Sequence, residues 1–161
     1  MPLFHPIALA NGDLTLRNGA ALAPMAGITT APFRPLCRKF SQDRCLYVSE
    51  MITARAFIER NERTMQLASF GKDETERRSL QLYGTNPETL AQATKMLVEE
   101  WGVHHIDMNF GCPVRKVTAA GGGSAIPVKP RLLQRIVRSV VASAGDVPVT
   151  IKFRKGISLC F

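Results

Sequence analysis

Short apolar runs that alternate with longer amphipathic runs are the feature that most constrains the fold of this 161-residue chain. The apolar runs have the length of strands, the segments between them have helical spacing, and no internal repeat interrupts the pattern. Such alternation is typical of βα units, because parallel strands need a helical crossover. We therefore predict a parallel sheet with strands at residues 20–28, 45–51, 79–84, 105–111 and 147–153.

Two of the intervening segments predict helices. In NPETLAQATKMLVEEWG, Asn86 is a suitable N-cap, Pro87 fits the first helical position, and Gly102 ends the run. KPRLLQRIVRSVVASAG has an apolar face and an opposite face that carries Arg131, Arg135 and Arg138. Such an arginine ridge is usually a solvated face, although in a basic protein it is also a candidate strip for phosphate contacts.

The predicted strands have a polar side as well as an apolar side. In SLQLYG, HIDMNFG and TIKFR, apolar residues alternate with Gln81, Asp107, Asn109, Lys152 and Arg154. If helices cover the outside of a closed barrel, these polar side chains point into its interior, where burial without partners would cost several kcal/mol. Near the carboxyl ends of barrel strands, the usual partner is a ligand or substrate. The pattern therefore favours an α/β barrel with a polar site.

The charge of the chain indicates a class of partner. The 21 Lys and Arg residues outnumber the 13 Asp and Glu residues, so the formal net charge is +8, as is typical of proteins that bind a polyanion such as RNA. Many basic proteins nevertheless bind no nucleic acid. No run reaches the roughly 18 apolar residues of a membrane span, and the four cysteines form no CxxC pair. We therefore expect a cytoplasmic protein with no membrane partner and no metal site.

A cysteine on a sharp turn is the strongest candidate for chemistry. GCP at residues 111–113 follows the fourth predicted strand, so Cys112 is expected at the carboxyl end of that strand, with its direction constrained by the neighbouring glycine and proline. Arg115 and Lys116 would favour a thiolate, whereas a shielded site would keep a thiol that donates a proton. The sequence leaves both states open, and a lone cysteine is most often a small buried side chain.

Two other segments favour the close approach of a ligand. TAAGGGSAI at residues 118–126 is a glycine cluster that leads toward a helix, and such loops let backbone amides approach a phosphate or a ring. Three glycines can equally form a flexible connector. APMAG at residues 23–27 ends the first predicted strand with small residues and a proline, which would permit a flat cofactor to approach closely.

Six segments, taken together, resemble those of a known family. They are APMAGITTAPFR (23–34), SEM (49–51), QLYG (81–84), D-x-N-x-GCPVRKV (107–117), GGGSA (121–125) and KFRKG (152–156). In this order and spacing they resemble the signatures of the tRNA-dihydrouridine synthases (Dus), from about residue 7 to residue 157. The resemblance implies an FMN-dependent TIM barrel, (β/α)8, that reduces particular uridines of tRNA to 5,6-dihydrouridine, with NADPH as the electron donor.

The resemblance also implies which residues bind the flavin. They are Pro24, Met25, Ala26, Gln81, Lys152 and Arg154. The first three would cradle the isoalloxazine ring through their backbone, and Gln81 would hydrogen-bond its polar edge. Lys152 would contact the same edge and stabilise the negative charge of reduced flavin. Arg154 would lie near the flavin or the substrate, and the role of Glu50 stays open.

A second group of residues is implied for the RNA substrate. Cys112 would be the general acid, because hydride passes from the flavin to C6 of uracil while the thiol protonates C5 from the opposite face. Asn109 would reach the flipped-out uracil. The phosphates on either side of it need cations, and Arg34, Arg115 and Lys116, all near the predicted barrel mouth, are the candidates. The charge of the chain and the resemblance therefore agree on tRNA as the partner.

The sequence departs from the family pattern at two points. Ala119 and Ala120 occupy places where the family usually carries another basic pair. A closed eight-stranded barrel takes roughly 250 residues, so the last strands, a histidine near the flavin, the loops for the FMN phosphate and a helical tRNA-binding domain are expected to be absent. Residues 1–161 would then be one partial FMN-binding domain, an amino-terminal portion with about five strands. Such a portion would expose a strand edge and half of an apolar barrel interior.

Two alternatives remain open at this point. One is an FMN-barrel oxidoreductase that acts on a small pyrimidine, which would be indifferent to tRNA, whereas a tRNA enzyme would bind tRNA with a steep dependence on salt. The other is an inactive fragment. The sequence names neither the modified uridines, nor the preference for NADPH over NADH, nor the oligomeric state, for which a monomer is the default.

Overall fold

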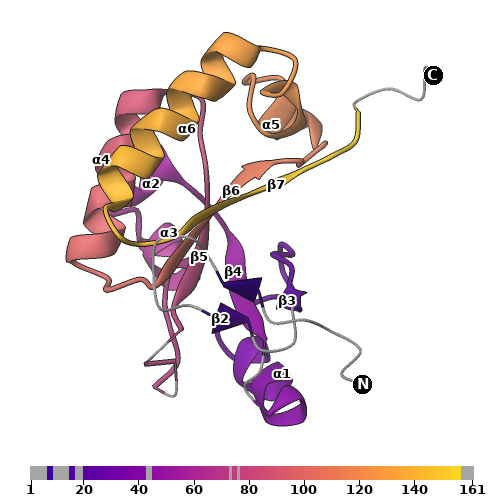
Figure 1. Cartoon of the computed structure of the whole chain (residues 1–161), viewed down its shortest axis with the longest axis vertical. Coiled ribbons are helices and arrows are strands. Elements are labelled where there is room, and N and C mark those ends of the chain that lie inside the picture. Colours follow the sequence, from indigo (N-terminus) through magenta and orange to yellow (C-terminus); the bar gives the residue numbers. More distant parts are fainter. Residues whose placement is uncertain are drawn as a thin grey trace.

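The computed structural model describes residues 7–8, 15–16, 20–42, 45–72, 74–75 and 77–156. Its centre is a parallel sheet that curls into half of a barrel, with strands in the order β3-β4-β5-β6-β7 (Figure 1). The strands are β3 (Ala21–Leu22), β4 (Leu46–Thr53), β5 (Ser79–Tyr83), β6 (His105–Phe110) and β7 (Val149–Phe153). The five predicted strands are confirmed, and the arrangement is that of the amino-terminal part of a TIM barrel.

Two differences from the prediction lie near the amino terminus. A small antiparallel hairpin of β1 (Ile7–Ala8) and β2 (Thr15–Leu16) was not expected. β3 pairs with β4 over two residues only, although a strand was predicted over residues 20–28. It ends early because the chain turns after Pro24, where the amides of Ile28 and Thr29 both donate to the Met25 carbonyl, at 3.1 and 3.0 Å.

Helices connect the parallel strands. They are α1 (Phe33–Ser41), α2 (Ala54–Ile58), α3 (Glu62–Leu67), α4 (Pro87–Glu99), α5 (Arg115–Thr118) and α6 (Pro130–Ala144), and a 3-10 turn, η1, spans Gly123–Ala125. The two predicted helices are α4 and α6, and both are confirmed. The Asn86 side chain caps α4 by accepting the Thr89 amide at 2.6 Å. Helices α4 and α6 lie side by side on the outer face of the sheet (Figure 1).

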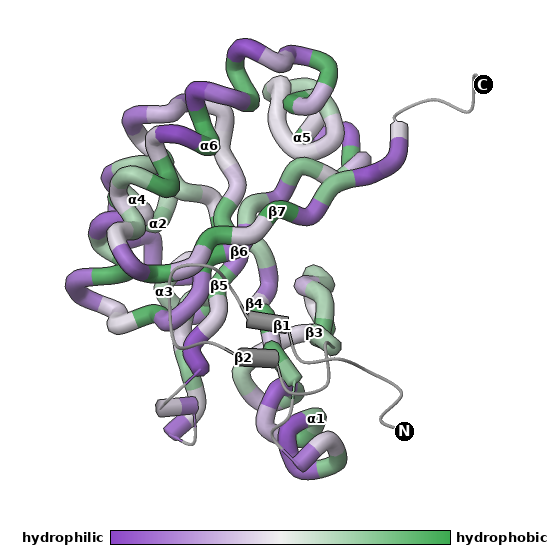
Figure 2. The backbone as a smooth tube through the Cα atoms, viewed as in Figure 1, coloured by the Kyte–Doolittle hydropathy of each residue, from purple (hydrophilic) through white to green (hydrophobic). Residues whose placement is uncertain are grey.

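The apolar residues of the strands form the core with these two helices. The strand side chains of this core are Leu80, Leu82, Ile106, Met108 and Phe110, each at most 1% exposed. They pack against Leu90, Ala93 and Leu97 of α4 and against Ile136 and Val140 of α6. Figure 2 shows the alternation of apolar and polar residues along β7 that produces the two faces. Helix packing therefore leaves the polar residues of the strands on the inner face.

β7 pairs with β6 at the edge of the described sheet. Its side chains Ile151 and Phe153 are 44% and 63% exposed. In register they stand opposite Met108 and Phe110, so they belong to the outer face. For β5, β6 and β7 the prediction that an open portion exposes an apolar barrel interior is therefore wrong, because the inner face of these strands is polar and the exposed apolar side chains of β7 lie on the helical side.

Candidate active site

The carboxyl ends of β5, β6 and β7 and the turn after β3 surround a small cavity of about 140 Å³. Residues predicted for the site that line it are Pro24, Ala26, Gln81, Asn109, Cys112, Lys152 and Arg154. Met51, Gly111 and Pro113 complete the lining. The fold thus brings together residues from separate segments that the sequence assigned to flavin, uracil and proton transfer.

Hydrogen bonds hold the turn that carries Cys112 from several sides. The Asn109 side-chain oxygen accepts the amide N–H groups of Gly111, at 3.1 Å, and of Cys112, at 2.9 Å. The Arg154 Nε donates to the Gly111 carbonyl at 2.7 Å, and the Ser124 amide donates to the Cys112 carbonyl at 3.0 Å. Cys112 itself is half-buried. The backbone around the thiol is therefore fixed before any substrate arrives.

The glycine cluster packs directly against this cysteine. Gly123 has a φ of 54°, and a Cβ at this position would lie 2.4 Å from the Cys112 carbonyl oxygen. A residue with a side chain would therefore push the cysteine turn aside. The amides of Gly121 and Gly122 donate to carbonyls of α5 at 2.9 and 3.0 Å. These two amides are thus engaged within the loop, which supports Cys112 instead of acting as a flexible connector.

A hydrogen-bonded network lies on the inner face and ends at this cavity. The Gln81 Nε2 donates to Asp107 at 2.5 Å, and the Asn109 Nδ2 donates to the Gln81 side-chain oxygen at 2.9 Å. The Thr150 hydroxyl donates to the other Asp107 oxygen at 2.5 Å and lies 3.0 Å from the His105 Nε2. Because the Thr150 proton is given to Asp107, His105 must donate from Nε2 and accept at Nδ1.

Burial sets the ionisation of two members of this network. It lowers the pKa of His105 to about 4, so the ring is neutral at pH 7. The His105 Nδ1 then accepts from the Ser79 hydroxyl, 2.7 Å away. Burial raises the pKa of Asp107, against the opposing effects of the hydrogen bonds from Thr150 and Gln81 and of the Lys152 charge. The network is therefore buried, yet its polar side chains have partners.

Several of these residues were not predicted as site residues. Strand parity predicted that Asp107 faces inward but gave it no role, and the same signal could have found Thr150 on the inner side of β7. Met51 had no such signal. Its sulfur accepts the Asn109 Nδ2 at 3.2 Å, and it reaches the inner face because the register of β4 shifts between Val48 and Met51.

Met25 and Glu50 contribute to the turn after β3. Met25 is 37% exposed and does not line the cavity, and its amide donates to the Thr29 hydroxyl at 3.0 Å. Its backbone N–H is thus engaged within the turn. Glu50, whose role the sequence left open, is buried in β4 and accepts the Gly27 amide. Glu50 therefore anchors to the sheet the turn that was expected to cradle the flavin.

Arg34 has a different environment from the one predicted. Its side chain is buried, and its Nε and Nη2 donate to the two oxygens of Glu74 at 2.7 and 2.8 Å. Its remaining hydrogen bonds are to the carbonyls of Thr29 and Ser69, both at 2.9 Å. A guanidinium enclosed in this way does not reach a substrate phosphate, so the predicted substrate contact of Arg34 is wrong. The buried pair instead ties α1 to the segment that precedes β5.

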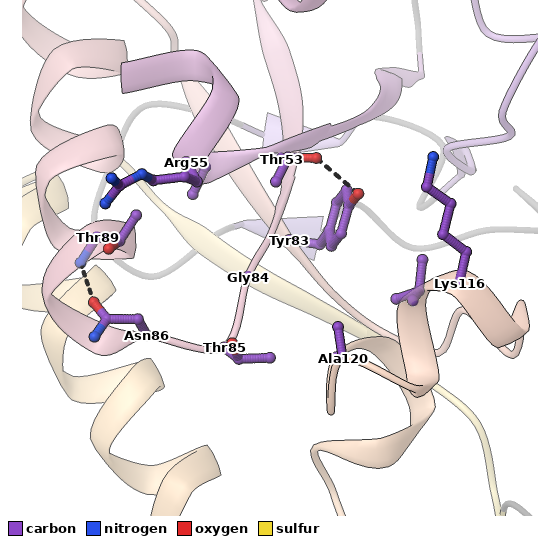
Figure 3. A pocket seen from close by; sticks show the side chains of 12 residues that line it. Thr53, Arg55, Tyr83, Gly84, Thr85, Asn86, Thr89, Lys116 and Ala120 are labelled. Atoms are coloured by element: carbon purple, nitrogen blue, oxygen red, sulfur yellow. Dashed lines mark hydrogen bonds between the residues drawn. The ribbon is translucent and has the colours of Figure 1, made fainter. Parts of the chain in front are cut away.

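Arg115 and Lys116 are exposed at the start of α5. Neither lines the cavity that contains Cys112. Lys116 lines a second cavity of about 520 Å³, which lies among α5 and the carboxyl ends of β4 and β5 (Figure 3).

The described residues contain no group of three or more His, Cys, Asp or Glu side chains that could hold a metal ion. In the same part of the chain, none of the helices has the length and apolar character of a membrane span.

Known proteins match this chain over most of its length. The family model described as "Dihydrouridine synthase (Dus)" matches residues 21–159. A "Probable tRNA-dihydrouridine synthase" of Mycobacterium tuberculosis is 51% identical over 157 residues, which cover 93% of this chain and 40% of the relative. The "tRNA-dihydrouridine synthase B" of Shewanella oneidensis is 41% identical over 145 residues, 90% of this chain and 44% of the relative. The chain thus spans less than half the length of these relatives.

Proposed function

The chain belongs to the dihydrouridine synthase family, and from this premise we propose that it forms the amino-terminal part of the catalytic domain of a tRNA-dihydrouridine synthase. Such an enzyme is a flavin-dependent oxidoreductase that reduces uridine in tRNA to 5,6-dihydrouridine, with NADPH as the electron donor, in the cytoplasm. The observation that supports this proposal most strongly is the single cavity shared by Cys112, Asn109, Gln81 and Lys152.

The residues of this cavity fit the polar edge of FMN. That edge carries both hydrogen-bond acceptors and a donor, and the Gln81 carboxamide, 1% exposed and held by Asp107 and Asn109, offers both kinds of group in a fixed orientation. Lys152 adds a positive charge beside it. When bound, FMN supplies the hydride for C6 of uracil. Pro24 and Ala26 would meet the ring through their backbone, and Arg154 would hold the Gly111 carbonyl beside it.

In this proposal Cys112 supplies the proton of the reaction. Reduction of the C5–C6 double bond adds one hydride and one proton, and the Cys112 Sγ–H gives the proton to C5 and then regains one from solvent. The hydrogen bonds from the Cys112 amide to Asn109 and from the Ser124 amide to the Cys112 carbonyl keep the thiol in one place. A positioned acid of this kind typically contributes 10²–10⁴-fold to a rate.

Asn109 has one contact that it can exchange for the substrate. Its oxygen already accepts two amides, but its Nδ2 donates to the Met51 sulfur at 3.2 Å as well as to Gln81. A thioether is a weak acceptor. We therefore expect a uracil carbonyl to replace the Met51 sulfur as the partner of this N–H group, which would align the base with the cysteine.

The test uses the chain extended with the carboxyl-terminal part of the Mycobacterium tuberculosis relative. After incubation with FMN and gel filtration, the extended protein is expected to retain flavin absorption and to form dihydrouridine in tRNA when NADPH is added. Cys112→Ala should keep the flavin and lose uridine reduction by at least about 100-fold. Cys45→Ala is the matched control, because this half-buried cysteine does not line the cavity.

Two results would contradict the proposal. Dihydrouridine formation at the wild-type rate by Cys112→Ala would remove the cysteine from the reaction. Reduction of free pyrimidines without any reduction of tRNA would instead assign the protein to the flavin oxidoreductases that act on small molecules.

A further inference from the structure

The second cavity, of about 520 Å³, shares a wall with the cavity that contains Cys112. The wall consists of the segment that joins β6 to α5, of α5 itself and of the glycine cluster. Cys112 and Pro113 line the smaller cavity, whereas Lys116 and Val117 line the larger one. Gly122 also lines the larger cavity, and the next residue, Gly123, packs against Cys112. A polymer that places one unit at Cys112 therefore has a neighbouring cavity one loop away.

An aromatic ring in a fixed orientation forms part of the larger cavity. Tyr83, at the end of β5, is half-buried, and its hydroxyl accepts a hydrogen bond from the Thr53 hydroxyl at 2.7 Å (Figure 3). This bond joins the ends of two neighbouring strands, so the ring is held by the sheet and not by a mobile loop. Such a ring is a suitable surface for the stacking of a nucleic-acid base.

The charge of the cavity is positive. Lys116 and Arg55 line it, and no acidic residue does so among the described residues. Arg55 is paired with Glu59 at 2.6 Å, with both side chains largely exposed. Lys116 is exposed, and within the described part of the chain its ammonium group forms no ion pair. Lys116 is thus the cation that can neutralise a phosphate.

From this arrangement we propose that the larger cavity binds a nucleotide of the tRNA strand that neighbours the reacting uridine, with its base on Tyr83 and a phosphate on Lys116. This inference rests on the proposed function, which places the uridine at Cys112. A cavity of this volume lies within the usual range of about 300–1,000 Å³ for small-ligand sites. RNA is favoured over a free nucleotide because the cavity adjoins the reaction cavity and the whole chain carries a net charge of +8.

The experiment measures tRNA binding by the extended protein at several salt concentrations, by fluorescence anisotropy. Lys116→Gln should reduce the slope of log Kd against log salt by about one unit, because one phosphate contact is lost. Tyr83→Leu should weaken binding about 10-fold, whereas Tyr83→Phe, which keeps the ring, should retain most of the affinity. Lys95→Gln is the control for charge, since Lys95 lies on α4 outside the cavity and pairs with Glu99.

The outcomes separate this inference from the proposed function. Wild-type Kd and salt slope in both Lys116→Gln and Tyr83→Leu would overturn the nucleotide site, while dihydrouridine formation by the wild type would still support the function. A raised KM for NADPH with unchanged tRNA binding would also overturn it, because the cavity would then serve the electron donor. A wild-type protein that forms no dihydrouridine would overturn both proposals. The melting temperature of Tyr83→Leu checks its fold, and Lys116→Gln tests the site at an exposed side chain that no core contact depends on.

Discussion

On β5 and β6 the outer and inner faces of the sheet are both buried, yet they are stabilised differently. On the outer face, Leu82 and Met108 are 0% exposed and pack against helices. On the inner face, Gln81 and Asp107 are 1% and 5% exposed, and each satisfies its polar atoms through a neighbour. Apolar packing has little directional preference, whereas a buried network depends on every partner. Burial alone therefore does not distinguish the face that stabilises the fold from the face that carries the site.

The largest effect is expected on the outer face. Leu82→Ala should lower the free energy of unfolding by about 2–5 kcal/mol, because it removes apolar contacts and leaves a cavity among α4, β5 and β6. A urea titration measures this loss. The flavin content of the folded fraction should stay unchanged, and a loss of flavin larger than the loss of folded protein would contradict the separation of the two faces.

The next effect is a dependence on pH that comes from the inner face. The His105 pKa is about 4 in the folded chain, whereas the ordinary value of 6.5 applies to the unfolded chain. Below pH 6.5 the unfolded chain therefore binds more protons than the folded chain. The neutral His105 ring therefore causes no loss of unfolding free energy above pH 6.5, and it lowers that free energy by about 3 kcal/mol as the pH falls to 4. Asp107 acts in the opposite direction at the acid end, because its raised pKa favours the folded state as the pH falls.

His105→Gln should remove this part of the pH dependence. Urea titrations of the wild type and of His105→Gln between pH 7 and pH 4 give the unfolding free energy at each pH. The effect of His105 is the difference between the slopes of these free energies against pH. Parallel slopes would show that the ring is accessible to protons in the folded chain.

A smaller effect is expected when the network loses one member. Gln81→Leu fills a similar volume but leaves Asp107 without one donor and Asn109 without one acceptor, which should cost about 1–3 kcal/mol in unfolding free energy. It should also weaken FMN retention, which Leu82→Ala should not. Gln66→Leu on the exposed surface of α3 is the control. A Gln81→Leu protein with wild-type stability and flavin would contradict the role of the network.

The smallest effect is expected at the uncovered part of the outer face. Phe153 is on the same face as Phe110 but is 63% exposed, so Phe153→Lys in the 161-residue chain should change the unfolding free energy by no more than about 0.5 kcal/mol. Comparison with Leu82→Ala then shows that helix cover, and not the face alone, determines the contribution of an apolar side chain. A loss above about 1 kcal/mol would contradict this.

The positions of the strands and the two long helices could be predicted because their signals are local. Alternation in HIDMNFG predicts which residues of β6 face inward, and Asn86 and Pro87 predict the start of α4. The predicted strand at residues 20–28 was too long because apolar character continues through a segment that the backbone turns after Pro24. Local composition does not reveal which backbone groups are paired.

Which residues gather around the cavity of Cys112 was predictable where the family segments carry them, and unpredictable where long-range pairing decides. Arg34 follows the APMAG motif, and the sequence therefore suggested that it contacts a phosphate. Its partner Glu74 is 40 positions away in the chain, and the two side chains form a buried ion pair. Met51 reaches Asn109 only because of an irregularity in β4. No local pattern predicts these contacts, since they depend on how distant segments meet.

Periodicity and caps in the sequence alone determined the order of the parallel strands and of the two long helices, the inward or outward direction of the residues of β5, β6 and β7, and the position of Cys112 at the end of β6. Tertiary structure decided which polar residues become partners, which glycine supports the cysteine and where a second cavity forms beside the first. The physical reason is that periodicity arises from neighbours in the chain, whereas a buried hydrogen bond or a cavity wall requires two segments to reach the same place with matched geometry.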